Sequence, residues 1–251
     1  MTGPTDSAGQ PWAGRHFEPN PNADDDGSAP PELIDAIDRF HAGQADQAAV
    51  VDVLRDARVL IPLLAKAGEL GLSDDGKLID KTQELAIVTV KGPDGRSVIP
   101  VFSSVGAMSA WNPTARPVPA TGVRVALAAA SEHTDLVVLD PTSPTEFGVR
   151  RPALWSMAKQ QPWTPAFSDV AVAAEFDRSV ADEPAVVALQ LAPGDPDARL
   201  AGPELLVVLT LIDGLDAEQL KSLFARLNER WSASELIAER VDSVEVRLAR
   251  A

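Results

Sequence analysis

Apolar residues recur at helical spacing in the first quarter of the chain. One stands every three to four positions over 33–40, directly after Pro30-Pro31, and the pattern resumes over 48–56. Residues with this spacing lie on one face of a helix, because an α-helix has about 3.6 residues per turn. The sequence therefore predicts two amphipathic helices in this region.

Short apolar runs predict strands in the next segment. The run 58–64 contains Pro62, which has no N–H to donate to a ladder, so we expect this strand at an edge or at a bulge. The runs 85–90 and 96–102 flank Gly92-Pro93-Asp94-Gly95. Proline presets φ and glycine supplies a positive φ, so these four residues predict the tight turn of a hairpin.

Capping residues and prolines mark the elements of the middle of the chain. Ser103 and Ser104 stand where a helix cap is expected, before an apolar helix that Asn112-Pro113 ends. The pattern then predicts a helix over 121–131, a strand over 135–139 and a short helix over 152–160.

The last third of the chain starts with a proline-containing stretch, 162–183, in which we expect a linker. Beyond it, Asp216 and Gln219 resemble a capping box that opens a helix with one apolar stripe. Strands are predicted over 185–191, 205–212, 236–241 and 244–248.

These elements predict an α+β protein of two small α/β-sandwich domains. We expect mixed or antiparallel sheets with helices packed on one face of each. The domains are expected over residues 32–165 and 166–251, with the boundary in the linker.

Residues 1–31 are expected to form a disordered acidic tail. They are rich in proline and contain Asp24-Asp25-Asp26. Such a segment buries too little apolar area to offset the entropy lost on ordering. Its aromatic residues, Trp12 and Phe17, leave two interpretations open: an inert tail, and a motif that docks on a partner protein.

Charge and composition exclude several classes of function. The chain has 22 Lys and Arg against 37 Asp and Glu, a net charge of −15, so it repels nucleic acid and acidic lipid surfaces. It has no cysteine, which rules out disulfides, thiolate nucleophiles and iron–sulfur clusters. The first residues do not resemble a signal peptide, and the longest apolar run, 205–212, is too short to span a membrane. We expect a cytoplasmic protein.

A particular order of motifs follows the two predicted helices. Leu60-Ile61-Pro62 precedes a segment that reads Ile-Pro-Val-Phe-Ser-Ser over 99–104, and a helix ending in Trp111 comes next. Pro117-Val118, the helix over 123–130 and the strand that ends in Asp140-Pro141 complete the order. This order resembles the N-terminal domain of the SseB family (enhanced serine sensitivity protein), over residues 45–160.

The segment 184–251, with Pro203-Glu204-Leu205-Leu206 before its helix, is more faintly similar to the C-terminal domain of that family. The resemblance implies a two-domain α+β fold. It implies no catalytic residue and no cofactor, because the family name records a phenotype. The positions of this chain that carry the resemblance are Pro100, Phe102, Ser103, Trp111 and Asp140-Pro141.

Motifs for known chemistries are incomplete. The segment 71–78 approaches a phosphate-binding loop, but Leu78 replaces the magnesium-binding hydroxyl and two carboxylates lie inside the loop. His133 with Asp135 and a nearby serine contains the residue types of a hydrolytic triad without its sequence context. We therefore predict no catalytic residue, no metal site and no cofactor.

Some residues remain as candidates for binding. Asp140 ends an apolar strand, where α/β proteins place functional groups, and a turn-forming role is the alternative. With Asp140, a ligand would contact Ser103, Ser104 and Trp111. Trp163, between two prolines, is the candidate for an exposed anchor that binds a partner, together with Trp12 and Phe17 of the tail.

Three classes of function follow from these observations. The first is a non-enzymatic module that binds another protein, supported by the tail, the aromatic residues near the linker and the lack of an intact catalytic motif. The alternative is a regulator that binds a small metabolite, linked to amino-acid (serine) metabolism by the resemblance. An enzyme that uses carboxylates alone also stays open.

Overall fold

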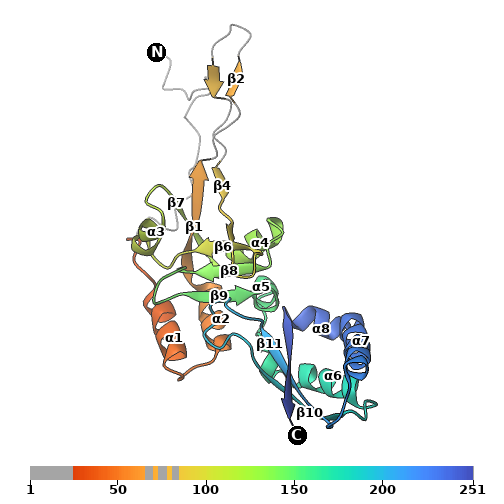
Figure 1. Ribbon diagram of the computed structural model, residues 1–251. Helices are drawn as coiled ribbons and strands as arrows, with labels where there is room; N and C mark the ends of the chain where they lie inside the picture. Colours follow the sequence, from red (N-terminus) through yellow and green to blue (C-terminus); the bar gives the residue numbers. More distant parts are fainter. Residues whose placement is uncertain (1–24, 66–69, 73–77, 81–84, 251) are drawn as a thin grey trace, which may run out of the picture.

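The computed structural model describes residues 25–65, 70–72, 78–80 and 85–250. The two predicted N-terminal helices are present as α1 (Pro31–His41) and α2 (Gln47–Asp56). Pro31 occupies the first turn of α1, and the carboxylate of Asp46 caps α2 by accepting a hydrogen bond from the N–H of Ala49. The two helices lie side by side at one end of the molecule (Figure 1).

The strand β1 (Arg58–Ala65) lies in the middle of a sheet with the order β4-β1-β7, in which all pairs are antiparallel. Its neighbours are β4 (Leu85–Ile87) and β7 (Arg116–Thr121). The prediction of an edge or bulged strand is therefore wrong. The backbone groups of Leu60 bond to Phe102 on the side away from β7, and Pro62, two residues further on, faces the same side. Pro62 is tolerated there because the pairing of β1 with β4 covers only Leu63–Ala65.

A second sheet has the order β5-β6-β8-β9. The predicted hairpin is confirmed in shortened form, since only β5 (Val90–Lys91) pairs with β6 (Ser97–Val101) around the turn. The strand β8 (Leu136–Leu139) is parallel to β6, and β9 (Phe147–Arg150) is antiparallel to β8. A separate antiparallel pair joins β2 (Leu70–Leu72) to β3 (Leu78–Asp80).

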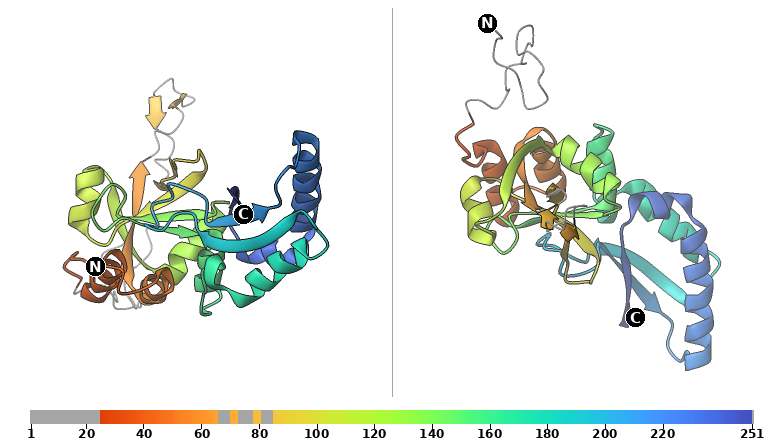
Figure 2. Two further views of the ribbon diagram at one scale, coloured as in Figure 1. Left: turned by 60° about the horizontal axis from the view of Figure 1, so that its bottom comes forward. Right: turned by 90° about the horizontal axis from the view of Figure 1, so that it is seen from above.

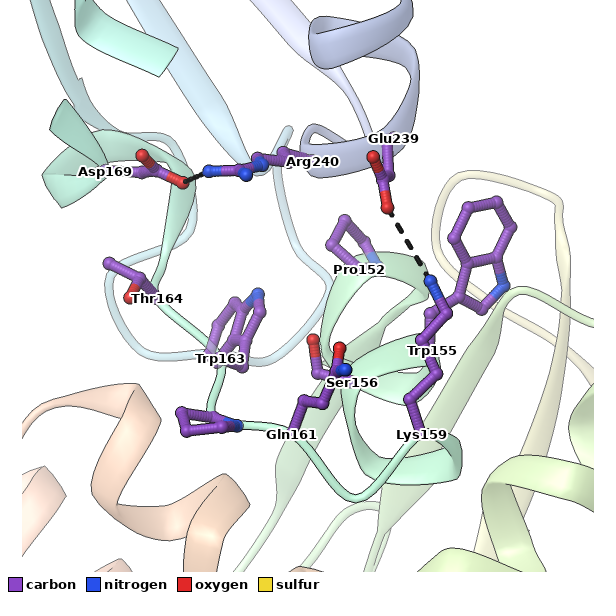
Figure 3. A pocket seen from close by; sticks show the side chains of 11 residues that line it. Pro152, Trp155, Ser156, Lys159, Gln161, Trp163, Thr164, Asp169, Glu239 and Arg240 are labelled. Carbon is purple, nitrogen blue, oxygen red and sulfur yellow. Dashed lines mark hydrogen bonds and ion pairs between the residues drawn. The ribbon is translucent and has the colours of Figure 1, made fainter. Parts of the chain in front are cut away.

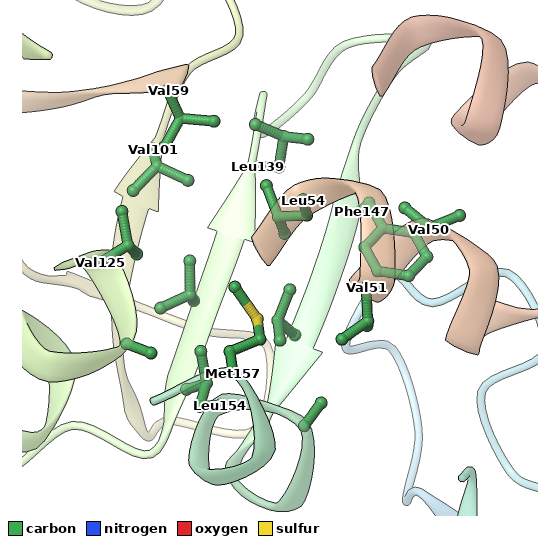
Figure 4. Packing of buried hydrophobic residues seen from close by; sticks show 14 of the residues in the cluster. Val50, Val51, Leu54, Val59, Val101, Val125, Leu139, Phe147, Leu154 and Met157 are labelled. Atoms are coloured by element: carbon green, nitrogen blue, oxygen red, sulfur yellow. The ribbon is translucent and has the colours of Figure 1, made fainter. Parts of the chain in front are cut away.

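Helices cover one face of this second sheet. The helices of this part are α3 (Val105–Trp111), α4 (Gly122–Ser131) and α5 (Arg151–Ala158). Side chains from α2, α4 and α5 pack on alternate residues of the strands and form a buried apolar core (Figure 4). The core needs several helices, because each helix is apolar on one side only.

The C-terminal part is a helix-covered, three-stranded sheet with the order β10-β11-β12. The strand β10 (Val186–Pro193) is antiparallel to β11 (Leu205–Leu211), whereas β12 (Val244–Arg250) is parallel to β11. The chain crosses from β11 to β12 through α7 (Ala217–Ala233), whose capping box forms as predicted. The helices lie on one side of the sheet (Figures 1 and 2).

Two predictions for this part are wrong. The expected linker contains a 3₁₀ turn, η1 (Ala166–Ser168), and an 11-residue helix, α6 (Val170–Val180), which Asp169 caps. The expected strand over 236–241 is the helix α8 (Glu235–Arg240), capped by Ser234. The apolar residues of both segments pack into the second core, so burial rather than local pattern decides their form.

The loop between β10 and β11 packs on the uncovered face of the β6-β8-β9 sheet. Leu200 belongs to a buried cluster with Val98, Leu136 and Val138. At Gly148 the approach is close: an added Cβ would lie 2.6 Å from Cγ of Leu200. A segment of the predicted second domain therefore completes the core of the first, and the division into two domains stays a prediction.

Residues 25–30, which the sequence places in the tail, are held against the body of the protein. The guanidinium of Arg58 donates to the carboxylate of Asp25, at 2.8 Å, and to the carbonyl of Ser28. The carbonyl of Gly27 accepts from the N–H of Val105, at 2.9 Å. Residues 25–30 thus belong to the folded part of the protein, although they lie within the tail expected over residues 1–31.

Candidate functional site

A cleft of about 220 Å³ lies where α5, the segment 161–164 and α8 meet. Two tryptophans line it: Trp155 on α5 and Trp163 on the segment between α5 and η1. Figure 3 shows Trp163 opposite Arg240 across the hollow, with Ser156 between Trp163 and Lys159. The cleft therefore draws its walls from parts of the chain that were predicted to belong to different domains.

Charged side chains of both signs surround the cleft. Lys159 pairs with Glu239, with 3.6 Å between Nζ and a carboxylate oxygen, and Arg240 pairs with Asp169 at 2.9 Å. Lys159 and Glu239 are both exposed, so their pair contributes little to stability and can be exchanged for contacts with a ligand. Arg240 is half exposed, whereas the side chain of Asp169 is 14% exposed and its other carboxylate oxygen caps α6. The cleft can thus receive acidic and basic groups.

The indole of Trp155 is 39% exposed although it is one of the largest apolar side chains. The guanidinium carbon of Arg151 lies 5.1 Å from the ring centroid, and the Lys159 ammonium lies 6.0 Å from it. Cations near the face of an indole attract its π electrons and hold the ring in place. Trp155 was not among the site residues expected from the sequence, because the pattern of the short helix over 152–160 does not show that its indole is partly exposed.

Trp163 is less exposed than an anchor was expected to be, since part of its ring packs on the N-terminal core. Its Nε1–H is buried and has no hydrogen-bond partner among the described residues, and the same holds for Oε1 of Glu204. Both residues line a small cavity of about 10 Å³ on the inner side of the cleft. This volume is close to that of one water-sized probe, which makes the cavity a candidate for a bridging water.

A network of buried charges joins the two parts of the protein next to this cavity. Arg150 donates to Asp195 at 2.7 Å and to Asp242 at 3.3 Å. Arg96 binds both carboxylate oxygens of Asp242, each at 2.9 Å. The side chain of Asp242 is 1% exposed, so its charge depends on these two arginines.

The pKa values of two carboxyl groups in this region, Glu204 and Asp242, are shifted in opposite directions. Burial raises the pKa of Glu204 to about 7; the N–H of Asp242, Arg150 and Arg151 oppose the rise, and the charge of Asp242 adds to it. Burial also opposes the ionisation of Asp242, but the hydrogen bonds and charge of Arg96 outweigh it and lower the pKa of Asp242. Glu204 is therefore the acid of this network that changes charge near neutral pH.

Asp140 makes a closed set of contacts at the end of β8. Its carboxylate accepts from the N–H of Ser103 at 2.8 Å, from the hydroxyl of Ser103 at 2.6 Å and from the hydroxyl of Thr145 at 2.8 Å. Asp140 is 1% exposed and has a φ of 45°. This geometry fits the turn-forming role, and ligand binding at Asp140 and Ser103 stays a prediction.

The other predicted site residues lie apart from the cleft. Ser104 caps α3 through the N–H of Ala107, and Trp111 packs on Phe102 with 5.3 Å between ring centroids. Trp12 and Phe17 lie outside the described residues, as does most of the incomplete phosphate-binding loop. The sequence did offer one signal for the contact between the two parts, since Glu204 stands in the Pro203-Glu204-Leu205-Leu206 motif that carries the fainter resemblance.

Part of this architecture matches a known protein family. Residues 32–156 match the family described as SseB protein N-terminal domain. The chain belongs to the SseB family. No curated protein and no solved structure matches it. The match includes α5 as far as Ser156, so the SseB domain contributes Trp155 to the cleft, while Trp163 and α8 lie beyond the matched residues.

Two features are absent from the described part of the chain. Within those residues, no helix combines the length and the apolar character needed to cross a membrane. The same residues contain no group of three or more His, Cys, Asp or Glu placed to hold a metal ion.

Proposed function

We propose that this SseB-family protein is a non-enzymatic module that binds another protein through the cleft between α5 and α8. The observation that carries the proposal is the exposed indole of Trp155, with Arg151 and Lys159 on its ring. Tryptophan and arginine dominate the binding energy of protein interfaces, because they combine a large apolar area with directed polar groups.

The cleft suits a peptide segment of a partner better than it suits catalysis. An apolar side chain of the partner fits against the indole of Trp163, and the exposed indole of Trp155, on the far side of Lys159, extends the contact surface (Figure 3). A carboxylate of the partner can replace Glu239 at Lys159, and a basic group can replace Arg240 at Asp169. The charged rim then selects the partner while the two indoles supply affinity.

The test is photo-crosslinking from the cleft. A photoreactive amino acid is placed at position 155, and at Leu127 on α4 as a matched control, because Leu127 is also exposed, at 54%. A protein that crosslinks from position 155 alone is identified, purified and titrated with the unmodified chain and with Trp155→Ala. We expect Trp155→Ala to weaken binding by more than tenfold. Equal affinity of both chains would place the interaction elsewhere.

A second candidate function is the binding of a small metabolite with charges of both signs, such as an amino acid. The volume of the cleft and its mixed charges favour it. A thermal-shift screen that includes L-serine tests this, since a ligand at a hundred times its Kd adds about 2.7 kcal/mol to stability. A shift that Trp163→Ala abolishes would favour this function over the interaction module.

A further inference from the structure

The strand β12 has a free edge. It pairs with β11 on one side, and no strand of the described residues pairs with it on the other. The N–H of Leu205 donates to the carbonyl of Ser243, at 3.0 Å. In a parallel ladder the N–H and C=O of one residue face the same neighbour and those of the next residue face away. The backbone groups of Val244, Val246 and Leu248 therefore point outward.

The side chains of β12 divide between the two faces of the sheet. Val244, Val246 and Leu248 lie on the face that the helices cover, in register with residues of β11. The helix layer does not reach the outer edge, so Val244 remains 37% exposed and Leu248 53% exposed. Glu245 and Arg247 lie on the opposite face and pair with each other at 2.9 Å.

This edge lacks the usual protection against pairing. Free edges are commonly blunted by proline, by a bulge or by lysines, and β12 contains none of these. Of its charged residues, Glu245 and Arg247 have opposite signs, so they can pair with their counterparts in a second strand of the same sequence.

We propose that β12 pairs with β12 of a second copy of this chain in an antiparallel, two-fold symmetric dimer. In the register that places Val246 opposite Val246, Val244 lies opposite Leu248 and Glu245 lies opposite Arg247 on both sides of the axis. The outward backbone groups of Val244, Val246 and Leu248 then exchange hydrogen bonds, and the exposed apolar side chains cover each other. Two three-stranded sheets become one continuous sheet.

Charge selects this register over its neighbours. A shift of the pairing in one direction places Arg247 opposite Arg247, and a shift in the other places Glu245 opposite Glu245. Like charges directly opposite each other destabilise a strand pair, whereas opposite charges stabilise it. The alternation of Glu245 and Arg247 therefore defines one self-complementary arrangement, and a two-fold interface closes on itself without forming fibres.

The first experiment measures the mass of the full chain by sedimentation equilibrium over a wide range of concentrations. We expect a monomer–dimer equilibrium that Arg247→Glu or Glu245→Arg weakens more than tenfold and that the double swap Glu245→Arg with Arg247→Glu restores. Leu127→Glu on α4 is the matched control for added charge. A chain that stays monomeric, or a dimer that the single swaps leave intact, would overturn the proposal.

A second experiment reads the register directly. The chain has no cysteine, so Val246→Cys carries a single thiol, which faces its own copy across the two-fold axis. The two Cα atoms would lie about 5.5 Å apart, within the range of a disulfide. Mild oxidation should crosslink Val246→Cys and should leave Val187→Cys, on the exposed part of β10, monomeric. Equal crosslinking of the two variants, or none of either, would contradict this pairing.

Discussion

At the scale of single residues, neighbouring serines have different roles. The hydroxyl of Ser104 caps α3, whereas the hydroxyl and N–H of Ser103 bind the buried carboxylate of Asp140. Sequence alone placed both serines at the cap, because a cap is a local signal. The bond from Ser103 to Asp140 spans 37 residues and depends on the parallel pairing of β6 with β8, which no local pattern reveals.

This difference predicts unequal effects of two similar substitutions. Ser104→Ala should lower the free energy of unfolding by about 1 kcal/mol, the cost of a lost cap. Ser103→Ala should cost more, about 1–3 kcal/mol, because it leaves a buried carboxylate short of a donor. Urea denaturation measures both, with Ser131→Ala as the exposed control. Equal costs at the two positions would count against the role given to Asp140.

The raised pKa of Glu204 predicts that the stability of the protein depends on pH. Its pKa is about 7 in the folded protein, above its ordinary value of 4.5, so the folded state holds a proton that the unfolded state has lost. The stability that this proton confers is complete below pH 4.5 and is lost as pH rises through 7. Glu204→Gln removes this loss, and at pH 8 it should raise the free energy of unfolding by up to about 3 kcal/mol relative to the unmodified chain.

Urea denaturation at several pH values between 5 and 8 checks this prediction. Glu183→Gln is the matched control, because hydrogen bonds from Arg226 lower the pKa of Glu183 against the opposing effect of burial. The stability that ionised Glu183 confers is lost only as pH falls below its ordinary range, so its replacement should not change the slope between pH 5 and 8. If Glu204→Gln also left the pH dependence of the free energy of unfolding unchanged, the Glu204 carboxyl would be ionised over the whole range from pH 5 to 8, and the prediction would be wrong.

At the scale of elements, periodicity and caps predicted most of the helices and strands. The predictions failed at 162–183 and 236–241, where apolar residues alternate with polar ones in ways that fit either form. The helices α6 and α8 pack against each other and against the sheet of β11, and this packing overrides the local preference. The cleft could not be predicted, since it is formed by these two misassigned segments.

Two glycines at helix starts predict opposite effects of the same substitution. Gly122 begins α4 where that helix crosses α2, and an added Cβ would lie 2.1 Å from the carbonyl oxygen of Leu54. Gly122→Ala should therefore cost at least about 2 kcal/mol, as overpacking does. Gly106, in α3, has no atom closer than 3.7 Å at that point, so Gly106→Ala should stabilise by about 0.5–1 kcal/mol. Thermal unfolding of both variants measures whether stability falls or rises. A Gly122→Ala variant as stable as the unmodified chain would contradict the close approach of α2 and α4.

At the scale of the whole molecule, the boundary predicted at residue 165 conflicts with the packing of the β10–β11 loop. Leu200 covers Leu136 and Val138, and the loop also supplies Asp195 as a partner for Arg150. A fragment that ends at residue 165 would expose one face of its sheet to water. It would also leave Arg150, which is 8% exposed, without its carboxylate partners.

We therefore expect a fragment of residues 25–165 to lose fixed tertiary packing, with weak near-UV circular dichroism and strong binding of a hydrophobic dye. A chain of residues 25–251 is the control for removal of the N-terminal segment and should unfold cooperatively. Leu200→Ala in that chain should cost about 2–5 kcal/mol, since it opens a cavity over the sheet. A fragment that unfolds cooperatively would instead support the boundary expected from the sequence, because independent folding requires a core that the fragment completes by itself.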